Sequence, residues 1–433
     1  MKRTAGARWH AARLLDSPHR LGFAAAALVV AGSALGWLFV LQTGGGTPAA
    51  LPPTAAHGLV FVFGFMPLFF TGFLFTVGPR WLGLPMEAAD TAARTRALLP
   101  PVLAFAAAWL AWWPLPVLMS RLLPGASAAM VPAALLTLAA ASWTLIVVRL
   151  QRLLRSPLRR DSPHLCVMAL ACAVGALALW AAALVVAGGA AAWAGLVAQA
   201  GLWLFCGGVF AAASHRMLPL DAMADRPALE ARFPLWQLAL IGGTLALQAL
   251  DLAVAAAWPR PAPWSALLAA AIAATALWLA LIAWRWARRQ RLGRQLVAML
   301  HAGLVWLAVA LALQAAAHAL AAFGGPGAGT ALEQAARHAL ALGWMGTTMF
   351  AMVSRVAGAF GGQARAADGS AWALFTFVQV AALSRVAAAL WPAAAGALTT
   401  IAAAAWLAAA LGWLLVYGRW LGRAPDRPPH RGT

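Results

Sequence analysis

Long apolar segments recur along the chain, separated by short polar or basic connections. Each is about twenty residues long, the length that a helix needs to cross the hydrocarbon core of a bilayer. Backbone groups in hydrocarbon must be hydrogen-bonded within their own segment, so we expect helices and not strands. The pattern predicts twelve membrane-spanning helices, at residues 21–42, 57–81, 98–120, 127–150, 164–187, 190–213, 233–257, 264–286, 296–321, 338–359, 371–391 and 396–418.

The composition agrees with this pattern. Of the 433 residues, 64% are hydrophobic and only 10% are charged, which is more apolar surface than a soluble domain of this size could bury. We therefore predict an all-α fold, a polytopic membrane helical bundle of about twelve helices. It forms one domain at 21–418 between a basic N-terminal tail at 1–20 and a basic C-terminal tail at 419–433. The first apolar segment is too long for a signal-peptide core, so we expect it to be retained.

The net charge of +20 comes from arginines that lie between the apolar segments. They do not gather on one soluble face, so we expect no nucleic-acid partner; the lipid bilayer is the partner. Basic clusters such as "RLQRLLRSPLRR" and "RWARRQRLGR" fall on alternate connections, together with both tails. By the positive-inside rule this places both termini in the cytoplasm.

Histidines near the ends of the apolar segments are the main candidates for a site. Ionisable groups at membrane depth are costly and commonly functional. The topology places His57, His318 and His338 on the outer side, and His215 and His301 on the inner side. Neutral imidazole is a common ligand of haem iron and copper. These five are therefore candidate metal ligands, although a single histidine on a helix is often only hydrogen-bonded to a neighbour.

Arginines accompany the inner histidines. Arg216 and Arg355 could bind the propionates of a haem, or they could be ordinary basic anchors at the membrane surface. By contrast, His10, His19 and His164 have the pattern of solvated or interfacial side chains.

Two charged residues lie well inside predicted helices. Asp251 interrupts "LALQALDLAVAAAW", and Arg385 falls in the middle of "ALFTFVQVAALSRVAAALW". A buried charge needs a partner, so an Asp251–Arg385 pair is the simplest expectation. Such a pair would suit a twelve-span secondary transporter, which is the alternative function.

Sulfur-containing residues do not indicate a separate site. The three cysteines lie in apolar segments without a CxxC spacing, so we expect neither a disulfide framework nor a covalently attached haem. Met345, Met349 and Met352 recur at helical spacing, which is more typical of packing than of copper ligation.

The stretch "HGLVFVFGFMPLFFTGFLFTVGPRWLG" combines several features. His57 begins it, Pro67 is expected to kink its helix, and Pro79 falls where the helix should end. Glycines such as Gly72 would let a neighbouring helix or a flat macrocycle approach the backbone.

This stretch resembles the signature helix of the NnrS family. Further resemblance lies in "SHRMLPL" at 214–220, in "HALALGWMGTTMFAMVSRVAGAFGG" at 338–362, and more weakly in "SPHRLGF" and "RLGRQLVAMLHAGLVWLAVAL". These segments occur in order over nearly the whole chain. The positions that match the family are His57, Gly72, Pro79, His215, Arg216, Pro219, His301, His338 and Arg355.

The resemblance implies a bacterial inner-membrane protein that binds haem and copper. It also implies a role in nitric oxide metabolism, in denitrification or in nitrosative stress, with nitric oxide or a redox partner as the interacting species. The chain departs from the family pattern at Gly58, where many members have Glu, and at "AFGG", where many have a further histidine. These departures weaken the case for copper more than that for haem. A catalytic haem–copper oxidase is disfavoured because the chain has no adjacent pair of histidines.

Overall fold

A computed structural model of the chain describes residues 8–45, 51–84, 87–122, 129–156, 162–217, 234–288, 292, 295–325, 327–360 and 368–423. Over these residues the regular structure is entirely helical, as the sequence predicts. The described helices fall into two compact units. Unit 1 comprises residues 1–198, 352–371 and 410–433, and unit 2 comprises residues 199–351 and 372–409. The single domain at 21–418 stays a prediction.

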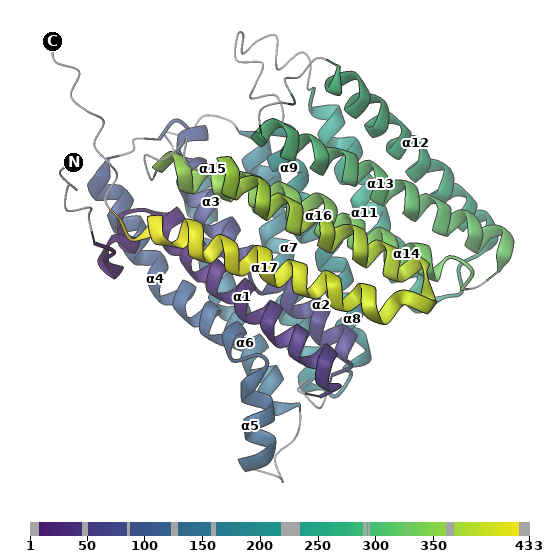
Figure 1. Ribbon diagram of the computed structural model, residues 1–433, viewed down its shortest axis with the longest axis horizontal. Helices are drawn as coiled ribbons and strands as arrows, with labels where there is room; N and C mark the ends of the chain where they lie inside the picture. The colour runs from purple at the N-terminus through teal and green to yellow at the C-terminus, as the bar shows by residue number, and fades with distance from the viewer. Residues whose placement is uncertain are drawn as a thin grey trace. The chain divides into compact units, whose positions relative to one another are not determined.

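Unit 1 contains the N-terminal helices. Their bounds are η1 Ala11–Asp16, α1 Pro18–Thr43, α2 Pro53–Phe63, α3 Met66–Trp81, α4 Ala88–Leu110, α5 Pro114–Leu122, α6 Met130–Leu154, α7 Pro163–Ala187 and most of α8 Ala192–Ala200. Helix α1 packs against α3 and α4, and α6 packs against α4 and α7 (Figure 1).

Unit 2 contains the middle of the chain. Its helices are η2 Gly201–Cys206, α9 Gly207–Met217, α11 Leu235–Ala257, α12 Ala262–Ala287, α13 Gln295–Gly324, α14 Thr330–His338 and η4 Ala339–Gly346. Helices α12 and α13 lie side by side along their length in Figure 1. Three further helices contribute residues to both units: α15 Thr347–Phe360, α16 Asp368–Leu390 and α17 Ala395–Leu421. The short element η5 Pro392–Ala394 belongs to unit 2.

Ten helical segments of the described residues are long and apolar enough to cross a membrane, if α2 with α3, α8 with η2 and α9, and η5 with α17 each count as one segment. An eleventh is obtained if the bent pair α4–α5 is one span. The protein is thus a multi-pass membrane protein, but the predicted number of twelve is not confirmed. The segment expected at 338–359 is helical from Thr330 to Phe360 yet is not among the ten. Its glycines, Thr347, Thr348 and Arg355 make it less apolar than the others.

The second predicted span differs from expectation at its centre. Instead of a kink at Pro67, the helix is interrupted at Gly64 and Phe65, between α2 and α3. Pro67 has no N–H to bond to the preceding turn, so the break falls just before it and the proline occupies the first turn of α3. Helix α3 also continues past Pro79 to Trp81, and Gly83 then closes the turn with a positive φ of 69°.

Candidate functional site

A buried ionic cluster lies in unit 2 where the end of α11 meets the start of α12. Asp251 is only 1% exposed. The guanidinium of Arg260 binds it through two nitrogens, with Nε 3.1 Å from Oδ1 and Nη2 2.6 Å from Oδ2. The indole Nε1 of Trp264 also donates to Oδ1, at 3.1 Å. Both carboxylate oxygens are therefore satisfied, as a charge in the membrane interior requires.

Helix α14 extends this cluster. Nη1 of Arg260 donates to Oε1 of Glu333 at 3.1 Å, so one guanidinium connects two carboxylates. Arg337, one turn further along α14, is 3.8 Å from the other oxygen of Glu333. That separation is longer than a hydrogen bond, so Arg337 is held more loosely than Arg260.

The expected Asp251–Arg385 pair is not found. Asp251 is bound by Arg260 instead, because the short connection between α11 and α12 brings Arg260 back over the end of α11. Arg385, half-buried on α16, interacts electrostatically with the like charge of Arg337. The sequence identified the buried acid but not its partner, since Arg260 lies in a connection and resembles an ordinary loop residue.

His318 lies beside this cluster on α13 and is completely buried. Its Nε2 is 3.3 Å from Nε2 of Gln314 and 3.4 Å from Oε1 of Gln248. Both glutamines are themselves more than nine-tenths buried. His318 is thus fixed by two carboxamides, which sequence reasoning did not identify.

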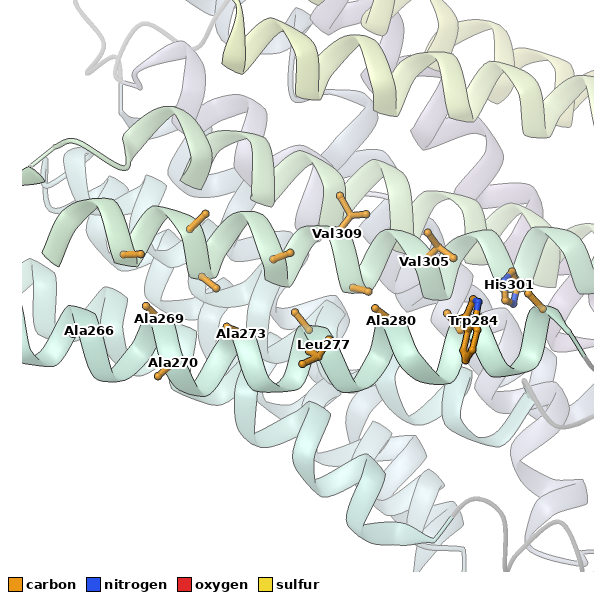
Figure 2. A pocket seen from close by; sticks show the side chains of 18 of the residues that line it. Ala266, Ala269, Ala270, Ala273, Leu277, Ala280, Trp284, His301, Val305 and Val309 are labelled. Atoms are coloured by element: carbon orange, nitrogen blue, oxygen red, sulfur yellow. The ribbon is translucent and has the colours of Figure 1, made fainter. Parts of the chain in front are cut away.

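An apolar groove runs between α12 and α13 on another face of unit 2. Its volume is about 990 Å³, and alanines from both helices form most of its wall (Figure 2). The alanines on α12 recur at alternating spacings of three and four residues, at 266, 269, 273, 276, 280, 283 and 287. Such small residues let the two helices approach closely and leave a shallow channel above the contact.

His301 lies at one end of this groove, near Trp284 (Figure 2). Its Nδ1 is buried and has no hydrogen-bond partner among the described residues. The guanidinium of Arg288 lies over the Trp284 ring, 4.0 Å from its centroid. A buried polar nitrogen and a positive charge therefore occur at the same end of an otherwise apolar groove. The alanine spacing could have indicated the groove from the sequence, but neither Trp284 nor Arg288 was distinguishable there.

His215 is on α9 and lines a much smaller cavity of about 30 Å³. It is buried and hydrogen-bonded to the backbone of Pro234. The aromatic rings of Trp278, Trp286 and Trp344 fill its surroundings. Its neighbour Arg216 is half-buried. His215 and His301 belong to the same unit but line different cavities.

His57 is in unit 1 and is held by aromatic rings. Its imidazole packs against Trp37 with centroids 4.2 Å apart and against Phe61 at 4.5 Å, tilted by 36° and 37° to the two rings. Gly58 contacts Ala198, and a Cβ there would be 3.1 Å from the alanine methyl group. The glutamate that many family members are expected to have at this position would therefore meet a packed neighbour.

His338 ends α14 in unit 2. Its Nδ1 is 2.8 Å from the backbone carbonyl of Gln334, and an Nδ1–H that donates there leaves the lone pair on Nε2. This tautomer is the one that metal-binding histidines commonly have.

The remaining candidates have simpler surroundings. Gly72 on α3 packs against α1, where a Cβ would be 2.6 Å from the ring of Phe23. Pro79 is buried within α3, and Arg355 on α15 is exposed. Pro219 lies outside the described residues. Gly72 was expected to admit either a neighbouring helix or a flat macrocycle, and the structure shows helix α1 there.

Two histidines that were expected to be solvated or interfacial are buried. His19 is 1% exposed, bonds to Ser17, and packs with its backbone against Gly72. His164, near the start of α7, is 9% exposed. They are not solvated because both follow a proline that begins a helix, and that helix turns them toward the interior of unit 1.

Within the described part of the chain, no group of three or more His, Cys, Asp or Glu side chains is arranged to hold a metal ion. Met345, Met349 and Met352 are all buried, which agrees with their interpretation as packing residues.

Residues 13–424 match the profile of the family described as NnrS protein. This match covers nearly the whole chain, so the protein belongs to the NnrS family. No curated protein matches it.

Proposed function

We propose that this NnrS-family protein binds haem within the cytoplasmic membrane of a bacterium and acts in nitric oxide metabolism or nitrosative stress tolerance. Membership of the family supports the proposal, and the groove between α12 and α13 is the structural observation that carries it. The groove combines an apolar wall, a histidine with a buried and unpartnered nitrogen, and a cation.

The residues of the groove fit a haem in size and chemistry. Small-molecule and cofactor sites commonly have volumes of about 300–1,000 Å³ and mostly apolar walls, and this groove, at about 990 Å³, is at the upper end. The alanine methyl groups offer a flat surface for a macrocycle. His301 would bind the iron, and Arg288 would bind a propionate.

The side chains around the groove have distinct tasks in this proposal. His301 would supply the imidazole nitrogen that holds the iron. Trp284 keeps the guanidinium of Arg288 at the groove's end by a cation–π contact. The alanines exclude water from one face. When bound, haem supplies an iron centre that binds nitric oxide or passes electrons to a redox partner.

Copper is not part of the proposal. Gly58 stands where the family resemblance implies a carboxylate, and no three-ligand group occurs among the described side chains. His57 and His338 remain candidate haem ligands. Their rings are held by Trp37 and by the Gln334 carbonyl respectively, so each imidazole has a defined orientation.

The test is the absorption spectrum of the purified protein, with haem quantified per polypeptide. His301→Ala is expected to lose most of the haem. The same measurement on His57→Ala and on His338→Ala tests each of these histidines as a ligand in its own unit. His10→Ala, in an exposed side chain, is the control and should retain the wild-type content. Equal haem in His301→Ala and His10→Ala would remove the groove as the site.

A pair of adjacent alanines makes a second, sterically matched test. Ala273 lines the groove, whereas Ala274 is exposed next to it and does not. Ala273→Phe should exclude haem, and Ala274→Phe should leave its content unchanged. If both variants bind haem equally, the cofactor does not lie in the groove. Addition of nitric oxide to the reduced wild-type protein should then shift the haem absorption band.

A second candidate function is secondary transport, which the buried Asp251–Arg260–Glu333 cluster favours. Intramembrane charges that face a bundle interior commonly mark ion or substrate pathways. A colourless preparation that takes up a solute in proteoliposomes in response to an ion gradient would support transport over haem binding.

A further inference from the structure

A small polar cavity separates the ionic cluster from the residues that hold His318. Gln248, Asp251, Gln314 and Glu333 are among the side chains that line it, and its volume is about 10 Å³. A cavity needs about 10–15 Å³ to hold one water molecule, and the molecule needs two to four polar partners. The space is therefore sufficient for a single water-sized ligand.

Two glutamines that line this cavity each have one carboxamide atom without a partner among the described residues. Nε2 of Gln248 and Oε1 of Gln314 are buried without a hydrogen bond to any described residue. The two side chains are 2% and 6% exposed, so bulk solvent cannot satisfy these atoms. An unsatisfied buried polar atom costs free energy, and two at one cavity indicate a missing ligand.

The protonation of His318 decides which atoms face the cavity. If Nε2 carries the proton, it donates to the oxygens of both amides, and both NH₂ groups turn to the cavity. If Nε2 carries the lone pair, it accepts from an NH₂ group, and carboxamide oxygens turn to the cavity instead. The orientation in the structure is the mixed case, with one donor and one acceptor left over.

Only an amphoteric ligand satisfies all of these arrangements. An anion can accept from NH₂ groups but repels carboxamide oxygens, and a cation does the reverse. The formal charges of Asp251, Glu333, Arg260 and Arg337 at the cavity also cancel, so the site attracts neither sign. A water molecule accepts two hydrogen bonds and donates two.

We propose that this cavity binds one water molecule as a permanent component of unit 2. The water bridges Gln248 and Gln314, lies against Asp251, and connects the ionic cluster to the pair of amides that holds His318. A shift of the His318 proton between Nδ1 and Nε2 then reverses the hydrogen bonds of the amides and reorients the water, with no change in charge.

Radiolytic hydroxyl-radical footprinting of the full-length protein in detergent tests this site. Radicals that form from a bound water label adjacent rings even where bulk water is excluded. Trp203 lines the cavity and is 2% exposed, whereas Trp143 is equally buried at 1% and donates its indole N–H to a backbone carbonyl in unit 1. Trp203 should be labelled several-fold faster than Trp143. Equal, slow labelling of both rings would overturn the proposal.

Variants and salt separate water from other occupants. Gln248→Leu combined with Gln314→Leu removes both partner groups, so labelling of Trp203 should fall to the level of Trp143. Thr244→Val, a buried polar change elsewhere on α11, should leave it unchanged. Labelling that appears only when salt is added would assign the cavity to an ion and contradict the proposal. The wild-type comparison of the two tryptophans stands even if the double variant does not fold.

Discussion

One helix contact in unit 1 and one in unit 2 are made by contrasting means. In unit 1, α1 and α3 meet at Gly22 and Gly72, where a Cβ on Gly22 would be 2.6 Å from the Gly72 nitrogen. In unit 2, α11, the connection that follows it and α14 meet at Asp251, Arg260 and Glu333 through charged hydrogen bonds. The first contact is made by the absence of side chains and the second by long, ionised ones.

The contrast follows from the apolar solvent. Lipid is as apolar as a leucine side chain, so helices in a membrane gain little from burying apolar surface and associate through close van der Waals packing or through polar contacts. Glycine contacts need no desolvation but tolerate no added atom. A charged cluster tolerates some movement but depends on every charge keeping its partner.

The largest effect is expected at Arg260. Arg260→Ala leaves Asp251 buried with only the Trp264 indole, and breaking a buried ion pair in this way costs about 3–5 kcal/mol of stability. Thermal unfolding in detergent should show a large loss. Arg121→Ala, at an exposed arginine, is the control and should change little. A variant as stable as the wild type would show that water or lipid head groups reach Asp251.

The glycine contact should respond next. Gly22→Ala places a methyl group against the backbone of α3, and overpacking of this kind costs about 1–3 kcal/mol. Gly243→Ala on α11 is the matched control, because nothing lies within 4 Å of its Cβ position. That variant should be neutral or more stable by up to about 1 kcal/mol. Equal behaviour of the two variants would contradict the close α1–α3 contact.

The smallest effect is expected for an uncharged polar contact. Thr244 on α11 and Thr275 on α12 are joined by a buried hydroxyl hydrogen bond of 3.0 Å. Thr244→Val keeps the shape and removes the bond, and such contacts between membrane helices average about 0.6 kcal/mol. The same unfolding assay should detect a small loss. A loss as large as that of Arg260→Ala would show that neutral and ionic contacts stabilise unit 2 equally. It would contradict the larger contribution assigned to the ionic cluster.

The helical class followed from the sequence because it depends on local properties. The break between α7 and α8 at residues 188–191 was located correctly from "AGGAAA", since glycine there adopts a positive φ of 73°. The interruption between α2 and α3 was anticipated from Pro67, and it falls at Gly64 and Phe65, just before the proline.

The site was less accessible to sequence reasoning. Asp251 was identified by its depth in an apolar segment, but its partner Arg260 depends on how the connection folds back. His301 was identified by family resemblance, whereas the groove beside it depends on two helices packing along an alanine face. The burial of His19 depends on the contact between Gly22 and Gly72, which lie fifty residues apart.

By itself the sequence determined that the chain is helical, crosses the membrane several times and belongs to the NnrS family. These properties depend on hydropathy and on the order of motifs, and both can be read directly from the linear sequence. Only the tertiary structure decided which charge neutralises Asp251, which histidine faces an apolar groove and which glycines touch. Each of these contacts forms between atoms that come from distant positions in the sequence and lie within a few ångströms of each other. Many alternative contacts would have the same hydropathy pattern, so the pattern does not select one of them.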